Sequence, residues 1–85
     1  MPVISRFFGI LIMMHWRDHA PPHFHARYGD EEVTVEIETG KVTGAMGRRA
    51  LAIVQEWRKT HQEDLLLDWR LAEQRRPLNR ISPLE

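Results

Sequence analysis

Residues 23–38 read HFHARYGDEEVTVEIE, and this stretch decides the fold. Apolar and polar side chains alternate on both sides of Gly29-Asp30, a pair that is typical of a tight turn. Alternation with a period of two indicates a strand that buries one of its faces. The stretch therefore predicts a β-hairpin made of His23–Tyr28 and Glu32–Glu38.

A two-residue loop at Gly29-Asp30 also predicts the register of this hairpin. Tyr28 is expected opposite Glu31, and His23 opposite Glu36. Because side chains two positions apart share a face, the hairpin divides its residues into two sets. The core set is Phe24, Ala26, Val33, Val35 and Ile37, and the polar set is His23, His25, Arg27, Glu32, Thr34 and Glu36.

The residues before the hairpin also favour strands. Val3–Phe8 and Ile10–Trp16 are rich in β-branched, aromatic and long apolar residues, with Gly9 between them, and predict two strands or one bent strand. Pro21-Pro22 cannot continue a ladder, because proline has no amide hydrogen and forces the residue before it into an extended conformation. Arg17–Pro22 is therefore predicted to be a rigid loop.

The residues after the hairpin favour helices. A connector rich in glycine has room for one short strand, Lys41–Thr43, and apolar residues then recur at helical spacing in residues 48–59 and 62–75. Pro77 ends the second helix, and we expect residues 77–85 to pack loosely. The prediction is one α+β domain over residues 1–85. Three to four antiparallel strands within residues 3–43 precede two helices, within residues 48–75, that pack on one face of the sheet.

Composition limits the class of protein. The 85 residues include no cysteine, and their 12 basic and 12 acidic side chains give no net charge. Because cysteine is absent, we expect a cytoplasmic protein without disulfides. We expect no membrane association, because the apolar run of residues 7–14 is too short to span a bilayer. A core this small makes a homo-oligomer or a partner protein plausible. The lack of excess positive charge argues against a large nucleic-acid interface and leaves room for a local basic patch.

The stretch Asp18–His25, DHAPPHFH, holds three of the five histidines and a carboxylate. His23 and His25 share a face of a strand, close enough to bind one metal ion or to act as an acid–base pair. A divalent metal site would draw its ligands from Asp18, His19, His23, His25 and Glu36. The alternative without a site is that these histidines form ordinary cross-strand polar pairs.

Metal-free catalysis is a further alternative. His23 or His25 would serve as general base and Arg27 would stabilise a phosphate, a set suited to RNA cleavage. Elsewhere, Trp16, Arg48 and Arg49 are candidate binding residues. Trp16 lies at the end of a predicted strand, and the two arginines begin a helix, where cations oppose the helix dipole.

The chain resembles a known bacterial family on three motifs. These are Ile4-Ser5-Arg6-Phe7-Phe8-Gly9-Ile10, then Asp18-His19-Ala20-Pro21-Pro22-His23-Phe24-His25-Ala26, and then Arg48-Arg49-Ala50-Leu51 with Glu56-Trp57. They are similar to the domain-of-unknown-function family 4160. The resemblance implies a small bacterial protein, often encoded beside another small domain in a toxin–antitoxin-like gene pair, and it implies no catalytic residue.

Two hypotheses follow for function. The first is a component of such a two-gene module that acts through protein or nucleic-acid binding, with the histidine face and the Arg48–Arg49 region in contact with the partner. The alternative is a small hydrolase or ribonuclease that depends on His23 and His25, with or without a divalent metal ion.

Overall fold

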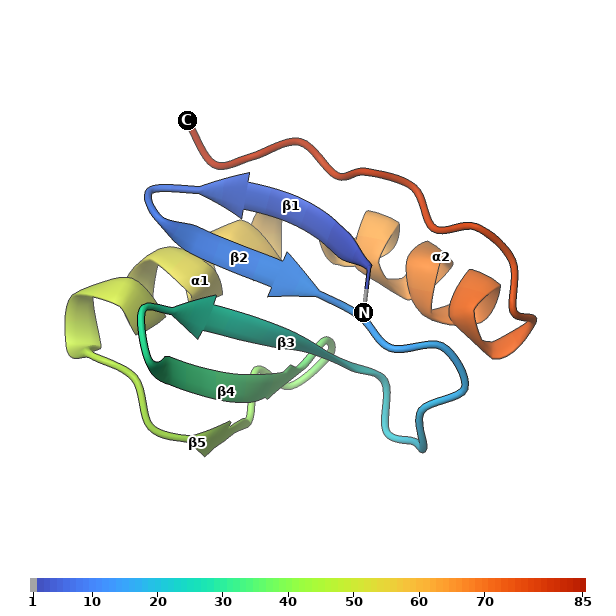
Figure 1. Cartoon of the computed structure of the whole chain (residues 1–85), viewed down its shortest axis with the longest axis horizontal. Helices are drawn as coiled ribbons and strands as arrows, with labels where there is room; N and C mark the ends of the chain where they lie inside the picture. The colour runs from blue at the N-terminus through green and yellow to red at the C-terminus, as the bar shows by residue number, and fades with distance from the viewer. Residues whose placement is uncertain (1) are drawn as a thin grey trace.

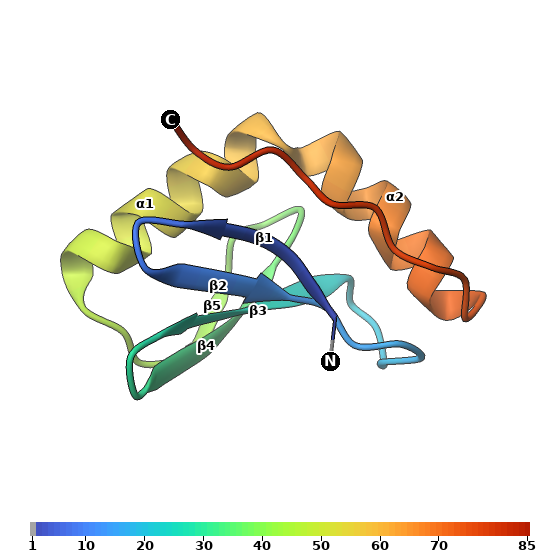
Figure 2. The ribbon, with the colours of Figure 1, turned by 45° about the horizontal axis from the view of Figure 1, so that its top comes forward.

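The computed structural model describes residues 2–85 as five strands followed by two helices. In chain order these are β1 (Val3–Phe7), β2 (Ile10–Met13), β3 (His23–Tyr28), β4 (Glu31–Glu36), β5 (Val42–Gly44), α1 (Arg48–Thr60) and α2 (Gln62–Glu73). The strands form one antiparallel sheet in the order β1-β2-β3-β4-β5 (Figure 1). α1 lies over one face of this sheet, and α2 continues past the ends of the strands toward the loop between β2 and β3 (Figure 2). The α+β class is thereby confirmed.

The strand count differs from the expected three to four. Phe8 and Gly9 both have positive φ, +48° and +78°, which is the conformation of a type I′ turn. The chain therefore reverses fully between β1 and β2 instead of bending. The short strand that the connector had room for also forms, since Val42 pairs with Val35. The sheet consequently has five strands.

The central hairpin has the predicted register. His23 pairs with Glu36, Phe24 with Val35, and Tyr28 with Glu31. All five members of the predicted core set are buried, at 2% exposure or less. His23 and His25 therefore point to the face of the sheet opposite the core, the face that α1 leaves uncovered.

The helices complete the core through their two tryptophans. Trp57 of α1 is fully buried and lies 5.3 Å from the ring of Phe7 and 5.7 Å from the ring of Phe24, while Trp69 of α2 is 4% exposed. The second helix ends at Glu73, shortly before the expected residue 75, because Arg75 adopts a left-handed conformation with φ +58°. Within residues 2–85, neither helix is long and apolar enough to cross a membrane.

The C-terminal tail is packed, and the expectation of loose packing was wrong. The Ile81 amide donates to the Ile4 carbonyl at 2.7 Å, and the Ser5 hydroxyl donates to the Ile81 carbonyl at 2.9 Å. The indole of Trp57 donates to the Ser82 carbonyl at 2.8 Å. Ile81 is buried, so the tail covers the edge strand β1, where unpaired backbone groups would otherwise be exposed (Figure 1).

Candidate functional site

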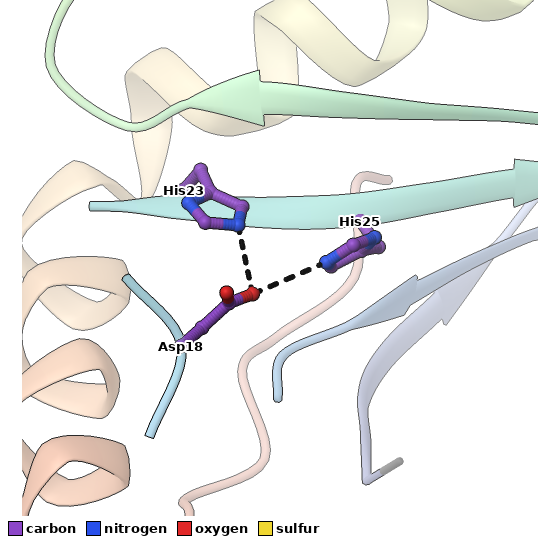
Figure 3. A group of neighbouring side chains, drawn as sticks. All are labelled: Asp18, His23 and His25. Atoms are coloured by element: carbon purple, nitrogen blue, oxygen red, sulfur yellow. Dashed lines mark hydrogen bonds and ion pairs between the residues drawn. The ribbon is translucent and has the colours of Figure 1, made fainter. Parts of the chain in front are cut away.

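Three side chains meet at the start of β3, where the proline-containing loop delivers the chain to the sheet. His23 and His25 lie two residues apart on β3, and Asp18 reaches them from the loop between β2 and β3 (Figure 3). One ligand-type atom from each residue lies within 4.8 Å of the other two. We call Asp18, His23 and His25 the Asp–His–His centre.

His23 is held at both ring nitrogens. Its Nδ1 lies 2.8 Å from the Pro21 carbonyl oxygen, and its Nε2 lies 2.9 Å from Oδ2 of Asp18. The ring also packs against the indole of Trp69, with 5.2 Å between centroids. The loop, the strand and α2 therefore fix the position of this imidazole together.

His25 is mostly buried, and its two ring nitrogens are buried but poorly paired. Its Nε2 lies 3.6 Å from Oδ2 of Asp18 and its Nδ1 lies 3.6 Å from a carboxylate oxygen of Glu32, both beyond hydrogen-bond distance. Among residues 2–85 neither nitrogen has a hydrogen-bond partner. Burial and the neighbouring His15 lower the pKa of His25, and the Asp18 carboxylate opposes them only in part. The ring is therefore neutral at neutral pH, with a lone pair available.

Asp18 is the charged member of the centre. Burial raises the pKa of its carboxyl, but the His19 amide and the imidazoles of His23 and His25 outweigh burial and hold that pKa below its ordinary value. Oδ1 accepts the amide hydrogen of His19 at 2.9 Å, while Oδ2 faces His23 and His25. The carboxylate is thus oriented by its own loop, with one oxygen directed at both imidazoles.

His15 is a member of the cluster that the sequence analysis missed. Its ring lies 4.1 Å from that of His25, and its buried Nε2 has no hydrogen-bond partner within the described chain. A signal was present in the alternation of β2. Met13 pairs with His25, so a residue two positions later points to the same face.

The centre lies at one end of a groove of about 360 Å³ on the uncovered face of the sheet, which we call the histidine groove. Thr34, Thr43 and Lys41 are among the residues that line the rest of it. Arg27, the predicted phosphate-binding residue, does not line it. Among the residues that line this groove, Lys41 is the one with a lysine or arginine side chain. The groove residues are Asp18, His19, Pro21, His23, His25, Thr34, Glu36, Lys41 and Thr43.

Two predicted metal ligands line the groove without joining the three-residue group. The side chain of His19 is 89% exposed, and its Nδ1 contacts Oδ1 of Asp18, the oxygen directed away from the other imidazoles. Glu36 lies opposite His23 in the ladder, as predicted, but its carboxylate accepts a hydrogen bond from Thr39 at 2.8 Å.

The candidate binding residues lie elsewhere. Trp16 is 47% exposed and its indole donates to the Arg76 carbonyl at 3.0 Å. Arg48 and Arg49 line a second cavity of about 270 Å³, together with Phe8 and Tyr28, which are 62% and 45% exposed. We call this cavity the aromatic groove. It joins exposed aromatic rings to two cations at the start of α1.

Comparisons with known proteins identify a family and no activity. Residues 9–70 match the family described as Domain of unknown function (DUF4160). No curated protein and no solved structure matches the chain. The matched range spans most of the chain and contains the whole Asp–His–His centre.

Proposed function

The chain belongs to the DUF4160 family, whose function is unknown, and we propose that it is a small hydrolase with the Asp–His–His centre as its reaction site. The observation that supports this proposal best is the convergence of Asp18, His23 and His25 at one end of the histidine groove. A neutral imidazole and a carboxylate within 3.6 Å of each other can orient and deprotonate water. A groove beside them provides room for a substrate.

Lys41 supports an anionic substrate. Lys41 lines the same groove as Thr34 and Thr43. An ammonium group and hydroxyl groups can donate hydrogen bonds to phosphate oxygens. We therefore propose that the bond hydrolysed is a phosphoester, in a small molecule or in RNA. Lys41 directly precedes β5 and lines the groove, so we propose it for the phosphate-binding role first given to Arg27.

An activity assay tests the proposal directly. Untagged protein is incubated with bis(p-nitrophenyl) phosphate, with single-stranded RNA and with p-nitrophenyl acetate, and we expect turnover of a phosphoester. His25→Gln should reduce the rate about 10²–10⁴-fold, the usual contribution of a group that moves a proton in the rate-limiting step. His61→Gln, a histidine in the turn between the helices, is the matched control. Equal rates in both variants would contradict the proposal.

A second candidate function is supported by the aromatic groove. Phe8 is exposed and adopts a positive φ, a conformation that other residues satisfy with less strain. Exposed aromatics beside arginines are common in protein interfaces. The groove thus supports a docking role, and the partner would be the second protein of a toxin–antitoxin-like pair, with acidic and apolar side chains facing Arg48 and Phe8.

Co-expression tests this docking role. The chain and the protein encoded beside it should co-purify, and replacing Phe8 with Asn together with Arg48→Glu should abolish the complex while His25→Gln leaves it intact. A complex that survives the double change would exclude the aromatic groove as its interface.

A further inference from the structure

We infer that the Asp–His–His centre is a binding site for one divalent transition-metal ion of the Zn²⁺ type, with Oδ2 of Asp18, Nε2 of His23 and Nε2 of His25 as its ligands. The inference deepens the proposed hydrolase and rests on it for its role. The bound ion would occupy the lone pair of His25 and would itself supply the charge that activates water beside the groove, in place of direct proton transfer to the imidazole. The binding itself is argued from the geometry of the three side chains.

The proton count at His23 is the first argument. The Pro21 carbonyl and the ionised Asp18 carboxylate can only accept hydrogen bonds, yet they face the two nitrogens of one ring at 2.8 and 2.9 Å. A neutral imidazole carries a single N–H and cannot donate to both acceptors. This pairing therefore needs a second proton on the ring or a cation shared between Nε2 and Oδ2.

The distances leave room for a shared cation. Oδ2 of Asp18 lies 2.9 Å from Nε2 of His23 and 3.6 Å from Nε2 of His25, and the three ligand-type atoms lie within 4.8 Å of one another. Ligands that stand about 2.0–2.1 Å from a tetrahedral zinc ion are about 3.3 Å apart from one another, a value between the two distances. A proton on His23 accounts for the first distance, but it leaves Nε2 of His25 unbonded beside Oδ2.

The surroundings of the two imidazoles fit the same interpretation. Histidines that bind metal through one nitrogen usually present the other to a backbone carbonyl or a carboxylate, which fixes the tautomer. Nδ1 of His23 faces the Pro21 carbonyl at 2.8 Å, and Nδ1 of His25 faces the Glu32 carboxylate at 3.6 Å. Both rings therefore direct Nε2 toward Asp18 and Nδ1 toward an oxygen acceptor.

The unpaired state of His25 is an independent indication. A polar ring buried without hydrogen bonds destabilises a fold, and neither nitrogen of His25 has a partner within residues 2–85. A bound ion would satisfy Nε2 and would leave Nδ1–H directed at Glu32. Two imidazoles and one carboxylate select a borderline-soft ion over Mg²⁺ or Ca²⁺, which prefer sets made of oxygen alone.

Metal binding can be measured on the unmodified chain. Untagged protein, stripped with a chelator and dialysed, is titrated with Zn²⁺ by calorimetry and observed by two-bond ¹H–¹⁵N NMR of the imidazoles. We expect about one ion per chain, with shifts at Nε2 of His23 and His25 and none at the ring nitrogens of His61. Zn²⁺ that binds with unchanged His23 and His25 resonances, or no binding at all, would overturn the inference.

Variants then separate ligands from neighbours. His23→Gln, His25→Gln and Asp18→Asn should each lose stoichiometric Zn²⁺ binding, whereas His19→Gln and Glu36→Gln should retain it. Glu32→Gln should weaken binding about 10-fold, the lower range for loss of a carboxylate that supports a metal-bound histidine. Co²⁺ absorption, which requires direct ligation, provides a second readout. Loss of binding in His19→Gln equal to that in His25→Gln would contradict the assignment.

The outcomes for the ion and for the hydrolase are distinguishable. Zn²⁺ binding without phosphoester turnover would support the metal site and contradict the proposed function. Turnover that persists in excess chelator and still requires His25 would support a metal-free hydrolase and contradict a role of the ion in the reaction, while absence of Zn²⁺ binding would contradict the metal site itself.

Discussion

The two faces of the β3–β4 hairpin differ in how their buried side chains are stabilised. On the face that the helices cover, Phe24 and Val35 are fully buried and contact other apolar side chains. On the other face, His23 and His25 are mostly buried, yet the nitrogens of His25 have no hydrogen-bond partner among the described residues. The comparison separates a face that stabilises the fold from a face that holds reactive groups at some cost to stability.

The largest expected effect is on the helix-covered face. Phe24→Ala removes a ring that contacts Trp57 at the centre of the core, and it should lower the free energy of unfolding by about 3–5 kcal/mol. Urea denaturation measures this loss. His25→Ala, on the opposite face of the same strand, is the matched control. A smaller loss for Phe24→Ala than for His25→Ala would reverse the comparison.

On the histidine face, apolar substitution of His25 should raise stability, whereas the same substitution of His23 should lower it. His25→Leu replaces a buried ring without hydrogen bonds and should raise the free energy of unfolding by about 1–2 kcal/mol, measured in the presence of a chelator. His23→Leu is the control. It removes the bonds to Pro21 and Asp18 and should therefore lower stability. If both changes lower stability, the imidazole of His25 stabilises the fold and the comparison fails.

The alternation of residues 23–38 was sufficient to predict the hairpin, its register and the orientation of His23 and His25, because strand geometry and turn length are local properties. Contacts between residues distant in sequence could not be predicted. The hydrogen bond from Ser5 to Ile81 joins residues 76 positions apart, and no local pattern in the tail indicates that it packs against the edge strand β1. The candidate site was predicted in part. The spacing of residues 18–25 predicted Asp18 near the histidines, but no local pattern indicates that His19 points to solvent or that His15 packs on His25.

Asp68 sharpens the comparison because it is a buried, incompletely paired group in the helix layer. It is fully buried, Oδ1 accepts the Asn79 amide hydrogen at 2.9 Å, and Oδ2 has no partner within residues 2–85. Burial raises its pKa, and the Asn79 amide opposes that effect only in part. Because the folded state favours the protonated carboxyl, the stability it contributes is present below the ordinary pKa of 3.8 and is lost as pH rises through the raised value.

Asp68→Asn should therefore stabilise the protein by about 1 kcal/mol at neutral pH, because an amide is less costly to bury than a carboxylate. The difference from the parent chain should shrink toward pH 4. Thermal unfolding between pH 4 and 7 measures this, with Glu73→Gln, at an exposed position of the same helix, as control. A stability difference that does not change with pH would show that the Asp68 carboxyl does not titrate differently in the folded state.

The smallest effect is expected at the turn between β1 and β2, where an aromatic ring lies outside the core. Phe8 is 62% exposed at φ +48°, and a type I′ turn favours Asn before Gly. Phe8→Asn should raise the free energy of unfolding by about 0.5–1 kcal/mol through relief of the left-handed conformation.

Phe8→Ala separates the contribution of the aromatic ring from that of the backbone conformation, because it removes the ring and keeps the unfavourable backbone. If Phe8→Asn destabilises the chain as much as Phe8→Ala does, the ring packs usefully against Tyr28 and Ile53, and the aromatic groove belongs to the stabilising side of the molecule. If only Phe8→Asn is stabilising, the wild-type turn retains a strained aromatic residue that folding does not need, which is the expected property of a docking surface.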